Sequence, residues 1–133
     1  MLTCLAMALA GAVTLSEIPT LAAEVEGDAR ALAAQTEVNA TFIAGLEDFS
    51  SDALRLSDSL REAGVTQDMP CIFRGISEDA RERVEEFQAA DTATERTMAF
   101  NGLKALLDDA ILLAPMAAGA AADVAVRQDM ASR

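Results

Sequence analysis

The stretch "LEDFSSDALRLSDSLREAG", residues 46–64, gives the clearest indication of the fold class. Apolar or small residues recur in it at alternating steps of three and four: Leu46, Phe49, Ala53, Leu56, Leu60 and Ala63. This spacing places them on one side of an α-helix and leaves the Ser, Asp, Glu and Arg residues on the other side. Gly64 suits the left-handed conformation that ends a helix, and Val65 suits a contact back to the last turn. The stretch therefore predicts an amphipathic helix with one buried face.

A second stripe of the same kind precedes it, between Thr20 and Asp48. Its members are Val25, Ala29, Leu32, Thr36, Asn39, Ile43 and Leu46. The two polar members interrupt an apolar face, and we interpret the Asn as a buried residue that fixes the register of paired helices. The two stripes are one residue out of phase. We therefore expect either a bend in one long helix at residues 47–52 or a new helix capped there by Ser50 or Ser51.

Residues 68–87 predict a short helix followed by a longer one. Asp68 and Pro70 suit a helix start, Gly75 suits the end of that helix, and Ser77 suits the N-cap of the next helix. The buried face of the second of these helices is expected at Ala80, Val84 and Phe87.

The C-terminal part of the chain predicts two more helices, separated by Pro115. Thr92 and Glu95 have the spacing of a capping box, so a helix begins there. Its buried face is expected at Ala99, Leu103, Leu106, Ala110 and Leu113. Pro115 ends this helix and takes the first position of an Ala-rich, close-packing helix that buries Met116 and Val124.

No window alternates apolar and polar residues in the way a half-buried strand does. Together these patterns predict an all-α protein, an antiparallel bundle of three to four main helices. The bundle is expected to be a single domain of residues 23–133, preceded by a signal peptide.

The first 22 residues predict that signal peptide. Residues 1–15 are uncharged and almost entirely apolar, and small residues around Ala22 and Ala23 suit cleavage there. Residues 8–10, Ala-Leu-Ala, offer an alternative cleavage site. The apolar run is too short to span a bilayer, which takes about 20 residues. We therefore expect a periplasmic or secreted protein with no membrane span after cleavage, although no Lys or Arg precedes the apolar run.

Composition excludes several classes of function. The 22 acidic and 10 basic residues give a net charge of −12, which repels nucleic acid and anionic membranes. The chain has no His, so His-based metal sites and catalytic triads with a His base are excluded. It also has no Trp or Tyr, no Cys-x-x-Cys and no Gly-rich phosphate loop. No cofactor is therefore predicted.

Cys71 is the one thiol that remains once the leader, with Cys4, is removed. It falls on the expected first turn of a helix, where unsatisfied amides favour a thiolate, and Arg74 lies one turn further on. The apolar neighbours favour a buried, structural thiol instead. We favour the buried interpretation and keep open a disulfide to another molecule and a redox or catalytic role.

Two further groups of residues have simple structural interpretations. The acidic run at Glu78, Glu82 and Glu85 is expected to be a solvated helix face, because a straight helix directs its carboxylates outward and not toward one cation. The methionines of the mature chain are expected in the core: Met69, Met98, Met116 and Met130.

The sequence thus leads to three hypotheses about function. The first is a non-catalytic, exported helical bundle that acts by binding a protein partner or by self-association. The second is a thiol-dependent redox or disulfide-linked protein that uses Cys71, with Arg74 holding the thiolate. The third is a carrier of a small apolar ligand between the helices, near Phe42, Leu60, Phe87 and Leu103.

Overall fold

Four α-helices make up most of the chain that the structure describes. The structure is a computed structural model and describes residues 15–65 and 68–132. The elements in chain order are η1 (a short 3-10 helix, Leu15–Glu17), α1 (Ile18–Ala33), α2 (Ala40–Glu62), α3 (Met69–Ala89) and α4 (Ala93–Ala131). The described residues contain no strand, so the all-α prediction is confirmed.

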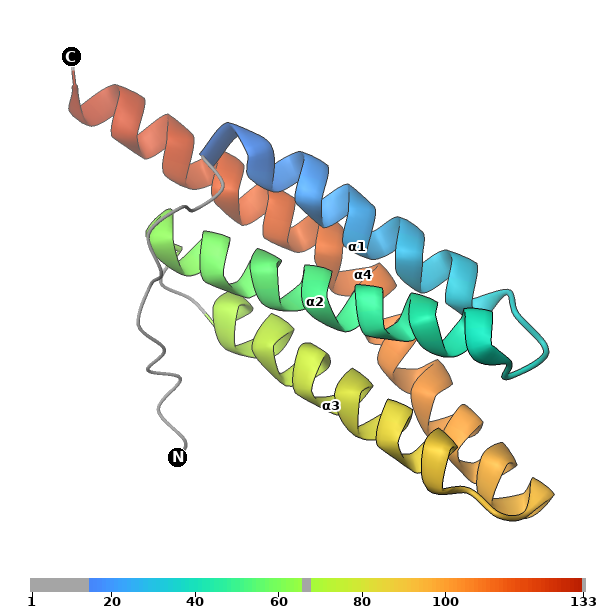
Figure 1. Cartoon of the computed structure of the whole chain (residues 1–133). Coiled ribbons are helices and arrows are strands. Elements are labelled where there is room, and N and C mark those ends of the chain that lie inside the picture. Colours follow the sequence, from blue (N-terminus) through green and yellow to red (C-terminus); the bar gives the residue numbers. More distant parts are fainter. Residues whose placement is uncertain (1–14, 66–67, 133) are drawn as a thin grey trace.

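The helices form an up-and-down, antiparallel bundle. α2 packs on α1 and α3, and α4 packs on α3 and α1, so helices that are consecutive in the chain are neighbours and the ring closes between α4 and α1. Figure 1 shows the chain reversing direction at each short connection. α4 is the longest helix: its N-terminal half lies beside α3, and its C-terminal half lies beside α1 (Figure 1).

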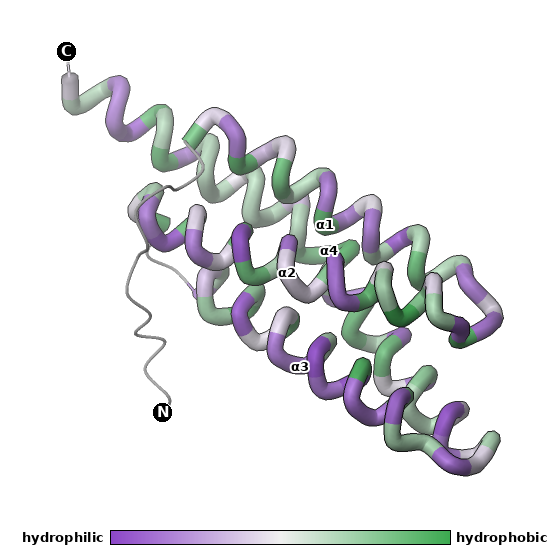
Figure 2. Tube along the Cα trace, viewed as in Figure 1, coloured by the Kyte–Doolittle hydropathy of each residue, from purple (hydrophilic) through white to green (hydrophobic). Residues whose placement is uncertain are grey.

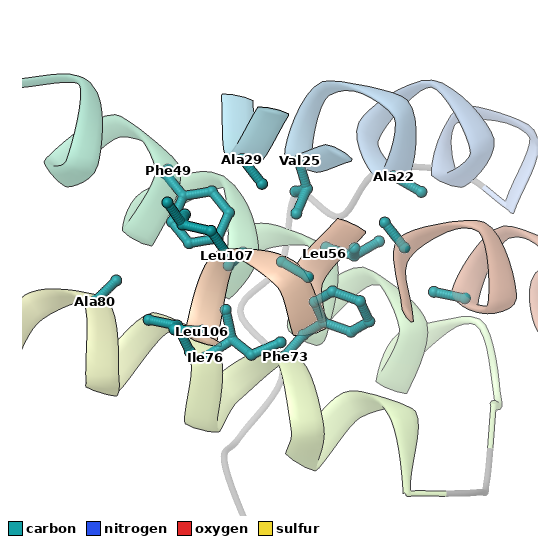
Figure 3. Close-up of a cluster of buried hydrophobic side chains, with 14 of the residues drawn as sticks. Ala22, Val25, Ala29, Phe49, Leu56, Phe73, Ile76, Ala80, Leu106 and Leu107 are labelled. Atoms are coloured by element: carbon teal, nitrogen blue, oxygen red, sulfur yellow. The ribbon is translucent and has the colours of Figure 1, made fainter. Parts of the chain in front are cut away.

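One hydrophobic core runs through the bundle and takes side chains from all four helices (Figure 3). The largest fully buried side chains include Phe49 of α2 and Phe73 of α3. Between α1 and α4 the buried residues are mostly small: Ala22, Val25, Ala29, Ala114, Ala117 and Ala121. Small side chains let two helix axes approach closely, so the Ala-rich segment is a close-packing helix, as predicted.

The predicted helix ends are confirmed at two places. Gly64 has a φ of 87°, the left-handed conformation, and the amide of Val65 donates to the carbonyl of Leu60 at 3.0 Å. At the start of α4 the hydroxyl of Thr92 accepts from the amide of Glu95 at 3.1 Å. The Glu95 carboxylate in turn accepts at 3.1 Å from the amide of Asp91, one residue before the N-cap, so the helix begins with the predicted Thr92 cap and a variant of the capping box.

The boundary between α1 and α2 differs from the prediction. The chain leaves the helix after Ala33, and Asn39 is the N-cap of α2, where its side chain accepts from the amide of Phe42 at 2.9 Å. The interpretation of Asn39 as a buried register residue is therefore wrong, because Asn at an N-cap satisfies a backbone donor that would otherwise be orphaned. Residues 47–52 lie inside α2 with no new start.

α3 is one helix, and this corrects the predicted stop at Gly75 and the predicted cap at Ser77. Ser77 is buried and donates its hydroxyl to the carbonyl of Ser50 in α2 at 2.7 Å, while the Ser50 hydroxyl donates to the Ser77 carbonyl at 2.8 Å. Seven residues along, Ser57 donates to the carbonyl of Pro70 at 2.5 Å. These serines hold α2 against α3, because each forms a hydrogen bond to the backbone of the other helix instead of capping a helix end. The same bonds provide partners for the buried hydroxyls.

Pro115 lies inside α4 and does not end it. A proline within a helix costs about 3 kcal/mol in lost hydrogen bonding and steric strain. The helix continues because both of its halves are held by packing, on α3 before Pro115 and on α1 after it. Because the helix continues past Pro115 without a change of phase, Ala117, Ala121 and Val124 are buried. Met116 is exposed, although the sequence predicted it in the core.

The prediction of a cleaved signal peptide stays a prediction, because residues 1–14 lie outside the described part of the chain. α1 begins at Ile18, and Ile18, Leu21 and Ala22 are buried in the core. Cleavage near Ala22 or Ala23 would therefore remove three side chains that the full-length chain packs between its helices.

Candidate interaction surface

The side of α4 that faces away from the bundle carries a stripe of exposed apolar residues. The stripe repeats at steps of four and three and comprises Leu112, Met116, Gly119, Asp123, Val126 and Met130. Its four large apolar side chains are 67%, 54%, 58% and 69% exposed, in chain order. We call these six residues the α4 outer stripe. Met130 and Met116, together with Met98, correct the prediction that these methionines lie in the core.

The surroundings of the stripe are unusually free of charge for this protein. From Ala110 to Val126 the only charged residue is Asp123, although charged residues make up 24% of the chain. The outer side of α3 shows the opposite pattern, with exposed Glu78, Asp79, Glu82 and Glu85. In Figure 2, α3 is largely purple, whereas the C-terminal half of α4 is mainly green. A helix that is apolar on all sides is normally covered on all sides.

α4 is also the one helix among the described residues that is long and apolar enough to cross a membrane by length and composition. Only 28% of its most apolar 18-residue window is buried inside the bundle.

Cys71 lies in the first turn of α3, as predicted, but its side chain is exposed. The interpretation that favoured a buried thiol is wrong. The buried face of α3 includes Phe73, and two residues along a helix correspond to a rotation of about 200°, so residue 71 is directed to the opposite side. The helical period, applied to the whole of residues 69–89, would have placed this thiol outside the core.

Arg74, the predicted partner of that thiol, forms an ion pair within α3. Its Nε lies 3.3 Å from Oε1 of Glu78. A guanidinium engaged with a carboxylate has less positive charge to offer a neighbouring thiolate. The thiol-dependent hypothesis for Cys71 and Arg74 stays a prediction, with no additional support from the geometry.

Four carboxylates gather where α1 meets α2, beside a surface pocket of about 370 Å³ lined by Asp28, Asn39, Phe42 and Asp48, among others. Burial, followed by a side-chain hydrogen bond with Asp52, raises the pKa of Asp28 from 3.8 to about 6. Repulsion from Asp52, Glu24 and Asp48 adds to the rise. Arg55 pairs with one member of this group, since its Nη1 lies 3.7 Å from Oδ1 of Asp52. The arrangement favours protonation of Asp28 at a higher pH than an ordinary aspartate requires.

This proton makes stability depend on pH. Because the folded-state pKa of Asp28 is raised, the folded chain binds more protons than the unfolded chain between pH 3.8 and about 6, so the free energy of unfolding falls as pH rises through that window. Solvent screening reduces the effect to about 1 kcal/mol. Asp28→Asn should stabilise the protein by about this amount at neutral pH and flatten the dependence, as measured by urea denaturation. A carboxyl NMR titration that placed Asp28 near its ordinary pKa would contradict the prediction.

The remaining predicted site residues lie in the core or on a solvated face. Phe42, Leu60, Phe87 and Leu103, the expected lining of an apolar ligand site, are all buried. The rings of Phe42 and Phe87 meet edge to face with their centroids 5.9 Å apart, so these side chains fill the space between the helices themselves. Within residues 15–65 and 68–132, no three potential ligands from His, Cys, Asp or Glu are placed to hold a metal ion.

Comparison with known proteins identifies no family for this chain. No family model matches the chain, and no curated protein or solved structure is significantly similar to it. The most distinctive surface of the fold is the α4 outer stripe, which sequence reasoning missed because it assumed a new helical phase after Pro115.

Proposed function

We propose that this protein is a non-catalytic helical bundle that acts by binding a protein surface through the α4 outer stripe, after export to a periplasmic or extracellular space. One observation carries the proposal: the large apolar side chains of Leu112, Met116 and Val126 stay exposed along Ala110–Val126, a segment with a single charge on a chain that is otherwise densely charged. Contiguous exposed apolar patches mark sites of interaction. The absence of His supports the non-catalytic part, because His is the commonest general acid or base.

A membrane-spanning α4 fits the same surface less well. The segment with one charge, Ala110–Val126, lies at the short end of the range of about 17–25 apolar residues that spans a bilayer. Insertion would place Asp123 in or near hydrocarbon, at a cost of about 3 kcal/mol. It would also pull Ala117 and Ala121 away from α1 and expose that helix's buried face. Docking of a protein leaves these inner contacts intact.

The proposal is tested by cross-linking in the cell. A photo-reactive amino acid at Leu112, whose side chain faces outward, should give a discrete cross-linked protein band on irradiation, because the partner covers this position. The matched control places the same amino acid at Glu82, an exposed position on α3, and should give no such band. Irradiation that yields only the uncross-linked chain at Leu112, or equal products at both positions, would rule the surface out.

A further inference from the structure

We propose that the partner is a second copy of this chain, bound through the α4 outer stripe with the two α4 helices antiparallel. The inference rests on the proposed function, because it names the occupant of the same surface. In this dimer Leu112 of each copy faces Met130 of the other copy, and Met116 faces Val126.

The order of residues along the stripe carries the argument. The steps between its six members are four, three, four, three and four, which read the same in both directions. Reversing the helix therefore superposes the stripe on itself about position 121. Large apolar residues occupy both ends, and the two central members are Gly119 and Asp123. A dimer with two-fold symmetry requires a surface that is complementary to itself in this way.

The centre of the stripe allows a close approach of the two helices. A Cβ added to Gly119 would meet no atom within 4 Å, so the space above it is open. In the antiparallel register Gly119 faces Asp123 of the other copy. The absent side chain leaves room for that carboxylate to reach water past the edge of the contact, which matters because a fully buried, unpaired carboxylate would oppose association.

Charge also favours this face for contact between copies. Two chains that each carry a net charge of −12 repel one another over most of their surface. The α4 outer stripe brings only one negative charge per copy into the contact, whereas a contact through the outer side of α3 would oppose Glu78, Glu82 and Glu85 to their own copies. Self-association is therefore least costly through α4.

The stripe covers less area than a standard stable interface. Residues 112–130 extend over about 28 Å of helix, which buries roughly 500 Å² per copy, below the 800 Å² or so of a standard stable interface. A dissociation constant of about 10 μM is therefore expected. Leu112→Glu places two new charges in the contact and should weaken the dimer by about 100-fold or more, as measured by sedimentation equilibrium.

Cysteine cross-linking tests the register. In a background with both native cysteines replaced, Cys4→Ser and Cys71→Ser, Ala122→Cys places a thiol beside the two-fold axis, so a short bis-maleimide should join two copies efficiently. Ala105→Cys is the matched control: it is equally an exposed alanine on α4, but in the antiparallel dimer its two copies lie far apart, so it should not cross-link. Leu112→Glu added to Ala122→Cys should abolish the product, while circular dichroism shows that the helices remain folded.

Each other outcome overturns the dimer. Cross-linking at both positions indicates parallel helices. If neither position cross-links, and the protein has the mass of a monomer at concentrations well above 10 μM, the partner is not a second copy. If Leu112 still forms a product in the cell with a different protein, the proposed function stands and only the identity of the partner is wrong. If that product is also missing, both proposals fail.

Discussion

Phe49→Ala is expected to lower the free energy of unfolding by about 3–5 kcal/mol, the largest effect among the substitutions considered for this protein. Phe49 of α2 is completely buried, and it belongs to the core cluster shown in Figure 3. Removing the ring loses its transfer free energy and leaves a cavity that four packed helices cannot close without moving apart. Urea denaturation followed by far-UV circular dichroism measures the loss.

The matched control for Phe49→Ala is Met98→Ala. Met98 lies on α4, is 69% exposed and is of comparable length, so its truncation removes little buried surface. The change in unfolding free energy should stay within about 0.5 kcal/mol. Equal losses from the two substitutions would mean that the core is not where the structure places it.

Ala117→Leu is expected to destabilise the bundle by about 1–3 kcal/mol, the second of the large effects. Ala117 is fully buried in the Ala-rich part of α4 that packs on α1. Leu is almost as good a helix former as Ala, so helix propensity does not account for the loss. The added carbons force α1 and α4 apart, because neighbouring small residues such as Ala114 and Ala121 set a close spacing. The same denaturation experiment measures it.

Ala105→Leu provides the control for this substitution. Ala105 lies on the exposed side of the same helix, so the added side chain projects into solvent. Its unfolding free energy should match that of the wild type to within about 0.5 kcal/mol. If both leucines cost the same, close packing between α1 and α4 is not the cause.

Both large effects concern the scaffold, and the scaffold determines what the α4 outer stripe presents. Because Ala114, Ala117 and Ala121 face α1, the opposite side of the helix is fixed in position and directed outward. A partner therefore meets exposed apolar side chains on a helix that is already held in place, which lowers the entropy cost of binding. Substitutions on the stripe should alter association with little change in the stability of the monomer.

Much of the local structure follows from the sequence alone. The amphipathic spacing around Phe49, the left-handed Gly64 and the Thr92 capping box depend on residues close together in the chain, so their patterns predict them correctly. The all-α class and the antiparallel bundle follow from the same local information. The acidic outer face of α3 is also a local property, since charged residues occupy most of the exposed positions from Glu78 to Glu86.

The interpretations that failed involve residues whose role depends on a neighbour from another helix. Ser is a residue type favoured at N-caps, so the sequence predicted Ser77 at a helix start. Only its reciprocal hydrogen bonds with Ser50 of α2 explain why it lies in the middle of α3. Pro is a residue type that usually breaks a helix, so the sequence predicted a helix end at Pro115. Only the packing of α4 on α1 and α3 explains why the helix continues. In both cases the local preference is worth a few kcal/mol at most, and tertiary packing exceeds it.

Composition and residue spacing alone show that the chain is helical, acidic and without His, because these properties need no information about which helices pack together. Only the tertiary structure decided which side of each helix is covered. The exposure of Cys71 and of the α4 outer stripe depends on where α1, α2 and α3 lie, and so does the raised pKa of Asp28 beside Asp52. Burial is a property of the assembled bundle, since the same apolar residue is core or surface according to what packs against it.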